Sequence, residues 1–352
     1  MLELFPETWI VAAVGAAGGV LLGLAARLGR FCTLGAIEDL LYGGSDTRLR
    51  MWCLAIGVAV AGSFALAGLG LFDPGASFYH SIRWMPLASI LGGLAFGYGM
   101  ALAGNCGYGA IARLGGGDLR SFVIVLVMGV SAYAVLAGPL APLRNWLFPQ
   151  EAVTGTPPAL AAYAAAWTGL PPALFGLAAG AGLIALALAS PELRRSPKSI
   201  FWAAVVGLAV VSGWAGTHWV AATGFEALPV VSHSFSAPVG ESILFAMTGS
   251  ARPLSFAVGS VAGVWLGAFI GSLVKGHFRW EACEDPRELR RQIFGAILMG
   301  GGAVVAMGCS VGQGLTAFST LAVSAPVTFL AVFAGAALGL RQLIEGFRQP
   351  AE

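Results

Sequence analysis

The stretch Met307-Gly-Cys-Ser-Val-Gly-Gln-Gly-Leu-Thr-Ala-Phe-Ser-Thr320 interrupts a run of apolar residues that otherwise has the composition of a membrane helix. It places Cys309 between glycines, and the segment after it is short but compatible with a helix. Inside a bilayer the backbone can bend only where protein or a water-filled path satisfies its N–H and C=O groups. A break of this kind therefore indicates a pore or a binding site.

A near copy of this break lies earlier in the chain, at Ala103-Gly-Asn-Cys-Gly-Tyr-Gly-Ala-Ile-Ala-Arg113. The glycines that frame Cys106 recur around Cys309 at an offset of 203 residues: Gly92, Gly97, Gly99 and Gly109 correspond to Gly295, Gly300, Gly302 and Gly312. A weaker match pairs residues 31–42 with 235–245 and aligns Glu38 with Glu241. Self-similarity at a fixed offset is the signature of an internal repeat.

The composition indicates a membrane protein. Hydrophobic residues make up 57% of the chain, charged residues only 10%, and the mean hydropathy is +0.82. Soluble domains have about 25% charged residues. The net charge of +2, without a dense Lys/Arg cluster, excludes a polybasic nucleic-acid binder.

Apolar runs of about 20 residues, the length that crosses a bilayer, predict an all-α polytopic protein with about nine transmembrane helices. The spans are expected near 8–28, 48–71, 86–104, 119–138, 172–190, 199–220, 253–274, 291–308 and 325–346. Shorter segments are interpreted as four re-entrant half-helices, near 32–43, 105–115, 236–249 and 309–321.

These elements form a single membrane-embedded transport domain over residues 1–352. Repeat 1 covers about 8–138, a linking span covers about 172–190, and repeat 2 covers about 199–346. Because one span separates the repeats, the second is inverted relative to the first. Inverted repeats with broken helices are a transporter architecture, with the substrate path between the halves.

The basic residues predict the orientation. All but three of the 19 Lys and Arg fall in loops on one side of the predicted topology; the exceptions are Arg83, Arg144 and Arg252. Cytoplasmic loops carry an excess of Lys and Arg. We therefore expect the N-terminus outside and the C-terminus in the cytoplasm.

Cys106 and Cys309 stand at the start of half-helices, and Cys32 precedes another. A helix N-terminus offers unpaired N–H groups and partial positive charge to an anion, and a thiol adds a soft, weak donor. The three cysteines are therefore candidate stepping stones for a sulfur-containing anion. The competing interpretation is that they are small buried hydrophobic residues.

Further residues of the two breaks are candidates for the same path. They are Asn105, Gly107, Ser310, Gly312, Gln313, Gly314 and Thr316, and ordinary hydrogen bonding between helices is the alternative role for the polar ones. Glu38 and Glu241 are candidates for proton relay or gating, with ion pairing as the alternative. The cysteines include no Cys-x-x-Cys and form no cluster with histidine, so neither a metal nor a cofactor is expected.

The segments Gly104-Asn-Cys-Gly-Tyr-Gly109, Gly308-Cys-Ser-Val-Gly-Gln-Gly314 and Arg30-Phe-Cys-Thr-Leu-Gly35 resemble the sulfur-transport motifs of the YeeE/YedE family of membrane proteins. The resemblance covers nearly the whole chain. It implies uptake of thiosulfate across the bacterial inner membrane along an hourglass-shaped path. Cys309 would lie on the outer side, Cys106 near the constriction and Cys32 toward the cytoplasm. It also implies a TusA-like sulfur-carrier protein as a cytoplasmic partner.

Other functions stay open at this stage. A membrane sulfurtransferase would form a cysteine persulfide and pass the sulfur on; it would need an activated thiolate with a base beside it, and no histidine or lysine is next to Cys106 or Cys309. A channel for another small anion or for a selenium compound is the third possibility. We therefore expect a permease rather than an enzyme.

Overall fold

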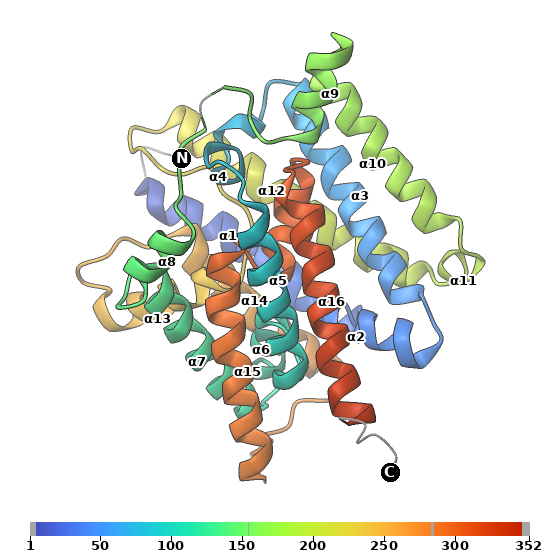
Figure 1. Cartoon of the computed structure of the whole chain (residues 1–352), viewed down its shortest axis with the longest axis vertical. Coiled ribbons are helices and arrows are strands. Elements are labelled where there is room, and N and C mark those ends of the chain that lie inside the picture. The colour runs from blue at the N-terminus through green and yellow to red at the C-terminus, as the bar shows by residue number, and fades with distance from the viewer. Residues whose placement is uncertain (1–4, 154, 283–284, 347–352) are drawn as a thin grey trace.

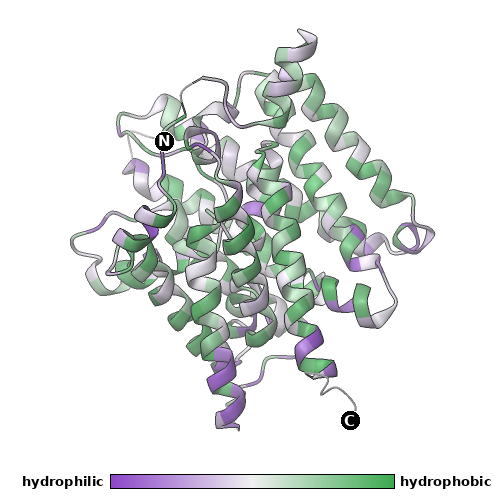
Figure 2. Ribbon diagram, in the orientation of Figure 1, coloured by the Kyte–Doolittle hydropathy of each residue, from purple (hydrophilic) through white to green (hydrophobic). Residues whose placement is uncertain are grey.

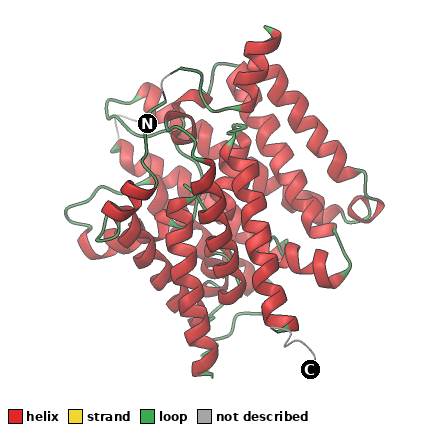
Figure 3. Cartoon of the chain, in the orientation of Figure 1, coloured by secondary structure: helices red, strands yellow, loops and turns green. Residues whose placement is uncertain are grey.

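The computed structural model describes residues 5–153, 155–282 and 285–346. These residues form helices joined by loops and turns, and none of them belongs to a strand of a sheet (Figure 3). Figure 1 shows the helices gathered into one bundle. The expected all-α polytopic membrane class is confirmed.

Among the described residues, seven helical stretches are long and apolar enough to cross a membrane. They are built on α1 (Glu7–Leu28), α3 (Thr47–Gly68), α5 (Pro86–Ala103), α7 (Leu119–Leu136), α12 (Pro197–Thr223), α14 (Phe256–Val274) and α16 (Ser324–Glu345). Their middle parts are hydrophobic, and the hydrophilic residues gather near the ends of the bundle (Figure 2). Helices satisfy their own backbone hydrogen bonds, which lipid requires.

Two more long helices occupy the remaining expected spans. The apolar helix α10 (Pro172–Leu188) has 17 residues, and α15 (Pro286–Val305) opens with charged residues. The start of α15 lies five residues before the expected one because the Asp285 side chain accepts the backbone N–H of Arg287, and proline at the first helical position continues the turn. A helix thus stands at each of the nine positions, and the number of crossings stays a prediction.

Short helices occur at the four positions expected for half-helices. They are α2 (Thr33–Glu38) with its π-helical continuation Asp39–Gly43, α6 (Gly107–Leu114), α13 (Ala237–Thr248) and the π-helical turn Gly312–Ala317. The connecting segments hold smaller elements, which are the 3-10 turn Pro74–Ala76, α4 (Phe78–Ser81), α8 (Ala141–Leu147), α9 (Leu160–Thr168) and α11 (Pro191–Arg194).

Glycines let α5 and α15 approach closely. A Cβ atom on Gly99 would lie 2.5 Å from the carbonyl oxygen of Gly295, and one on Gly295 would lie 2.6 Å from that of Gly99. Small residues allow this kind of backbone contact between membrane helices. Gly92 and Gly302 meet in the same way. A Cβ on Gly92 would lie 2.7 Å from the carbonyl oxygen of Gly302, and one on Gly302 would lie 2.8 Å from that of Gly92. The offset of 203 residues relates Gly99 to Gly302 and Gly92 to Gly295, so the two glycine pairs correspond to each other in the repeat.

Whole helices pack in matching pairs as well. The helix α1 packs on α14, and in the same way α12 packs on α3. Similarly, α5 packs on α16, and α15 packs on α7. Likewise α13 packs on α7 and α2 packs on α16. The helix α10 packs on α3 at the edge of the bundle (Figure 1). An inverted repeat with α10 as the linking helix would give this pattern, and the repeat stays a prediction that the pattern favours.

The first turn of α1 and the last turn of α16 lie at different ends of the bundle. The carboxylate of Glu7 accepts the backbone N–H groups of Phe225 and Glu226, which follow α12. At the other end, the hydroxyl of Tyr42 donates to Glu345 at 3.4 Å. An odd number of crossings requires such an arrangement.

Candidate functional site

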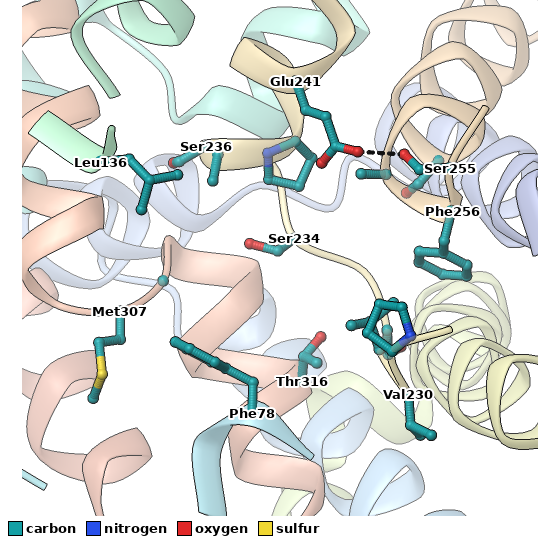
Figure 4. Close-up of a pocket in the computed structure, with 18 of the residues that line it drawn as sticks. Phe78, Leu136, Val230, Ser234, Ser236, Glu241, Ser255, Phe256, Met307 and Thr316 are labelled. Atoms are coloured by element: carbon teal, nitrogen blue, oxygen red, sulfur yellow. Dashed lines mark hydrogen bonds between the residues drawn. The ribbon is translucent and has the colours of Figure 1, made fainter. Parts of the chain in front are cut away.

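A cavity of about 530 Å³ opens at the end of the bundle where α1 begins, and we name it the Glu241 cavity. Apolar side chains such as Phe78, Leu136 and Met307 line it, together with hydroxyls from Ser234, Ser236, Ser255 and Thr316 (Figure 4). The hydroxyls of Ser234 and Thr316 face the central space. Glu241 accepts a 2.5 Å hydrogen bond from Ser255. Among the described lining residues, Arg144 is the sole cation.

A second cavity, of about 370 Å³, lies where α1 ends, and we name it the Glu38 cavity. Arg27 and Arg30 line it, whereas Thr8 lines the Glu241 cavity. At 1.5 Å per residue, α1 places Thr8 and Arg27 about 30 Å apart, so the two cavities open at opposite ends of the bundle. Cys32, Asn105 and Glu38 also line the Glu38 cavity.

Cys309 lies between the two cavities and is 1% exposed. The chain breaks before it at Met307, whose φ of +56° is unusual for a residue with a side chain. The thiol sulfur accepts backbone N–H groups from Phe235 at 3.3 Å and Gly312 at 3.4 Å. The hydroxyl of Ser234, which faces the Glu241 cavity, is 3.7 Å from the same sulfur. Cys309 therefore lies directly beneath that cavity.

Cys106 is the N-cap of α6 and is fully buried. Gly104, with φ of +78°, ends α5 just before it. The sulfur accepts the N–H of Gly109 at 3.4 Å, and the hydroxyl of Thr33 lies 4.0 Å away. Ser310, Cys32 and Cys309 surround the Cys106 thiol. Cys106 thus lies between the other two cysteines, next to the Glu38 cavity that Cys32 lines.

Some of the other candidate residues line one of the two cavities, and others form contacts within the two helix breaks. Asn105 and Glu38 line the Glu38 cavity, and Thr316 lines the Glu241 cavity while donating to the carbonyl of His233 at 2.6 Å. The hydroxyl of Ser310 is buried and meets hydrogen-bonding geometry with none of the described residues, although it lies near Cys106. An unpaired buried hydroxyl is available to a ligand.

Gln313 and the glycines contact protein. The amide of Gln313 donates to the carbonyls of Ala306 at 2.9 Å and Met307 at 3.1 Å, so it ties the break to the end of α15. A side chain on any of the three glycines would collide with a neighbour. Gly107 lies against Phe235 and Met128, Gly312 against Ser234, and Gly314 against Phe329. These glycines allow the half-helices to pack closely.

The sequence profile of a family described as sulphur transport matches residues 28–338, which include all three cysteine segments. The chain belongs to the sulphur transport family. The resemblance to the YeeE/YedE proteins is thereby confirmed. Two curated relatives are both named thiosulfate transporter TsuA. The one from Escherichia coli (strain K12) is 28% identical over 321 residues, covering 84% of each chain. The one from Spirochaeta thermophila is 27% identical over 318 residues, covering 87% of this chain and 91% of the relative.

Within this member of the sulphur transport family, two residues of the Glu241 cavity were not expected from the sequence. The first is Tyr79, whose side chain lies near Cys309. Its hydroxyl oxygen is 3.4 Å from the position that a Cβ on Gly312 would take. Burial raises the pKa of the Tyr79 phenol, and the nearby Cys309 adds to the rise, so the phenol stays a neutral donor. Arg144, on α8, has two buried guanidinium nitrogens without a partner among the described residues. Both residues lie on short helices, α4 and α8, in the connecting segments, where the sequence shows no periodic pattern.

The described residues contain no group of three His, Cys, Asp or Glu side chains that could hold a metal ion. The two buried histidines are engaged with hydroxyls, His80 with Thr320 at 3.1 Å and His233 with Ser260 at 2.7 Å. The polar groups that contact the thiols of Cys106 and Cys309 are hydroxyls and backbone N–H groups. Such neutral donors suit the transient binding of an anion.

Proposed function

We propose that the protein is a permease of the bacterial inner membrane that carries thiosulfate, or a closely related small sulfur anion, into the cytoplasm. The observation that supports this most directly is the order of the three cysteines. Cys309 lies beneath one cavity, Cys106 is buried next, and Cys32 lines the second cavity. No described residue lines both cavities, and a path past these thiols would join them.

The chemistry of the thiols suits thiosulfate better than sulfate. A neutral thiol is a weak donor with a polarisable sulfur, and the terminal sulfur of thiosulfate is equally soft. Hydroxyls of Ser234 and Ser310 can donate to the harder oxygens of the same ion. Each contact is weak, which a conducting path requires because the ion must leave every site that it enters.

The direction of uptake and the orientation are part of the proposal. The Glu38 cavity holds the basic residues near the end of α1, and basic residues favour the cytoplasmic side. The Glu241 cavity would then face outward, with the N-terminus outside and the C-terminus in the cytoplasm. A TusA-like sulfur carrier would receive the anion or its sulfur at the Glu38 cavity.

Proton coupling is a second part of this proposal. Glu241 and Glu38, which the repeat aligns, line the two opposite cavities. Carboxyl groups beside a membrane path can bind and release protons. A proton-linked permease would show faster uptake when the outer side is more acidic than the lumen.

The sulfurtransferase alternative is less well supported. The groups within hydrogen-bonding reach of Cys106 and Cys309 in the described residues are backbone N–H groups and hydroxyls. None of these is a base that could generate a thiolate. The two curated relatives are both named as transporters.

The test is uptake of ³⁵S-thiosulfate into proteoliposomes by the wild-type protein and by Cys309→Ala, Cys106→Ala and Cys53→Ala. Cys53 is the matched control, because its thiol donates to the carbonyl of Leu183 away from both cavities. We expect label in the lumen that excess sulfate competes poorly, lost in the first two variants and retained in the third. Absence of uptake, together with a persulfide on a cysteine after incubation with thiosulfate, would establish the sulfurtransferase instead.

A further inference from the structure

We infer that the Glu38 cavity is a binding site for a small divalent oxyanion from the cytoplasm, and that occupancy of this site slows transport. The inferred binding stands on the structure alone, whereas its effect on transport rests on the proposed function. Sulfate, hydrogen phosphate and thiosulfate share the required chemistry of two negative charges on a compact tetrahedral ion.

The lining of this cavity is strongly cationic. Five basic side chains from separate parts of the chain converge on it, and these are Arg27, Arg30, Arg48, Arg113 and Lys275. Glu38 is the sole acid among the described lining residues. The Glu241 cavity, by contrast, combines one arginine with one glutamate. The two cavities therefore differ by about four charges.

Four of these five cations form no ion pair with a described residue. Of the five cations, Arg48 is the one with an ion pair among the described residues, to Asp39 at 3.0 Å. Arg27 donates to the hydroxyl of Ser272 at 2.6 Å, and Lys275 donates to the carbonyl of Arg27. Arg30 and Arg113 make no ion pair within the described chain. Both of these side chains are exposed and solvated, but their convergence with the other cations gives the cavity a positive potential that attracts anions.

The general excess of basic residues on this side does not explain the arrangement. Arg290 lies on the same side and is exposed, as Arg30 and Arg113 are, but it lines neither cavity. The cavity cations are close enough to affect one another: burial and then Lys198, Arg30 and Arg27 lower the pKa of Lys275. Arg30 also has a left-handed backbone, with φ of +55°, which is uncommon for a residue with a side chain. Mutual repulsion and a strained backbone together indicate a site organised for a ligand.

A dianion is favoured over chloride because the attraction to each cation grows with the charge of the ion. A dianion in this position would lie beside Cys32, where the transported ion must emerge. Cytoplasmic sulfate would therefore compete with the exit of thiosulfate.

The binding test measures the thermal stability of the purified protein in detergent as sodium sulfate is added, with sodium chloride matching the ionic strength. A ligand that binds the folded state raises the melting temperature. The variants are Arg113→Gln and Lys275→Gln, with Arg290→Gln as the control on the same side and Arg144→Gln as the control for the other cavity. If one cavity variant fails to fold, the other still gives the comparison.

We expect sulfate to stabilise the wild type, Arg290→Gln and Arg144→Gln equally, and to bind the two cavity variants at least tenfold more weakly. An equal response in Arg113→Gln and Arg290→Gln, or a loss of the response in Arg144→Gln, overturns the site. Sulfate loaded on the Arg113 side of proteoliposomes should then slow thiosulfate uptake by the wild type but not by Arg113→Gln. Because the binding assay needs no transport, its result is independent of whether the protein moves thiosulfate.

Discussion

Cys106 and Cys309 are held by the same contact: each thiol sulfur accepts the backbone N–H of a glycine three residues later, at 3.4 Å in both cases. The glycines are Gly109 and Gly312, which the repeat aligns. Because this N–H occupies one side of the sulfur, the S–H group is free to turn elsewhere. The two thiols therefore have the same local geometry, each at the start of a short helical segment.

Serine in place of either cysteine keeps this geometry and removes the polarisable sulfur. We expect Cys309→Ser and Cys106→Ser to lower the initial rate of thiosulfate uptake by about tenfold, the factor that about 1.4 kcal/mol of lost interaction gives. Cys53→Ser should retain the wild-type rate. Equal rates in all three variants would show that sulfur chemistry at Cys106 and Cys309 does not matter for transport.

Arg144 offers the first positive charge to an anion that enters the Glu241 cavity. We expect Arg144→Gln to raise the KM for thiosulfate about fivefold to tenfold, with less effect on the maximal rate, because a charge at the rim mainly affects encounter. The difference should shrink in high salt. The measurement is uptake rate against thiosulfate concentration at two ionic strengths.

Arg83→Gln is the control for this prediction. Arg83 carries the same charge in the connection between α3 and α5, but it is exposed and paired with Glu151 at 3.0 Å. It lines neither cavity. A similar rise of KM in both variants would mean that general surface charge, rather than the cavity, attracts the anion.

The contact between Gly99 and Gly295 predicts a loss of stability on substitution. Gly99→Ala would place a methyl group 2.5 Å from the carbonyl oxygen of Gly295, and such overpacking costs about 1–3 kcal/mol. Gly182→Ala in α10 is the control, because a Cβ there meets nothing within 4 Å. Thermal unfolding in detergent should show a lower melting temperature for Gly99→Ala alone, and unchanged stability of that variant would contradict the packing.

His80, in the connection between α3 and α5, predicts a pH dependence of stability. Burial lowers its pKa to about 4 from the ordinary 6.5, so the folded protein binds fewer protons here than the unfolded chain. Its contribution is therefore fully present above pH 6.5 and is lost as the pH falls toward 4, by at most about 3 kcal/mol.

We expect the stability of His80→Gln to depend less on pH than that of the wild type between pH 6.5 and 4. Glutamine can still hydrogen bond to Thr320, whose hydroxyl lies 3.1 Å from His80. The measurement is the melting temperature of both proteins in steps of pH. Parallel curves over this interval would assign the acid sensitivity to other groups.

The sequence predicted the positions of the long helices well, because an apolar run of about 20 residues has few alternatives in a bilayer. It also located the breaks, since glycine beside cysteine interrupts such a run at Gly104 and Gly308. It could not predict side-chain direction within the breaks. Gln313 was expected to line the path, and that role stays a prediction, because the amide donates its hydrogen bonds to the carbonyls of Ala306 and Met307.

Residues in the connecting segments were the least predictable part of the candidate site. Tyr79 and Arg144 reach the Glu241 cavity from short helices whose positions depend on tertiary packing. The asymmetry of the basic residues was visible in the sequence, but their convergence on the Glu38 cavity was not. Convergence of this kind depends on distances between α1, α6 and α14 that the sequence pattern does not contain.

The buried layer formed by Cys309, Ser310 and Cys106, each at most 1% exposed, has a bioenergetic consequence. A continuous file of water across an energy-conserving membrane would let protons leak and dissipate the gradient that drives ATP synthesis. A barrier of thiols and one hydroxyl interrupts such a file between the two cavities. A cell could therefore keep many copies of this protein in its membrane without discharging it.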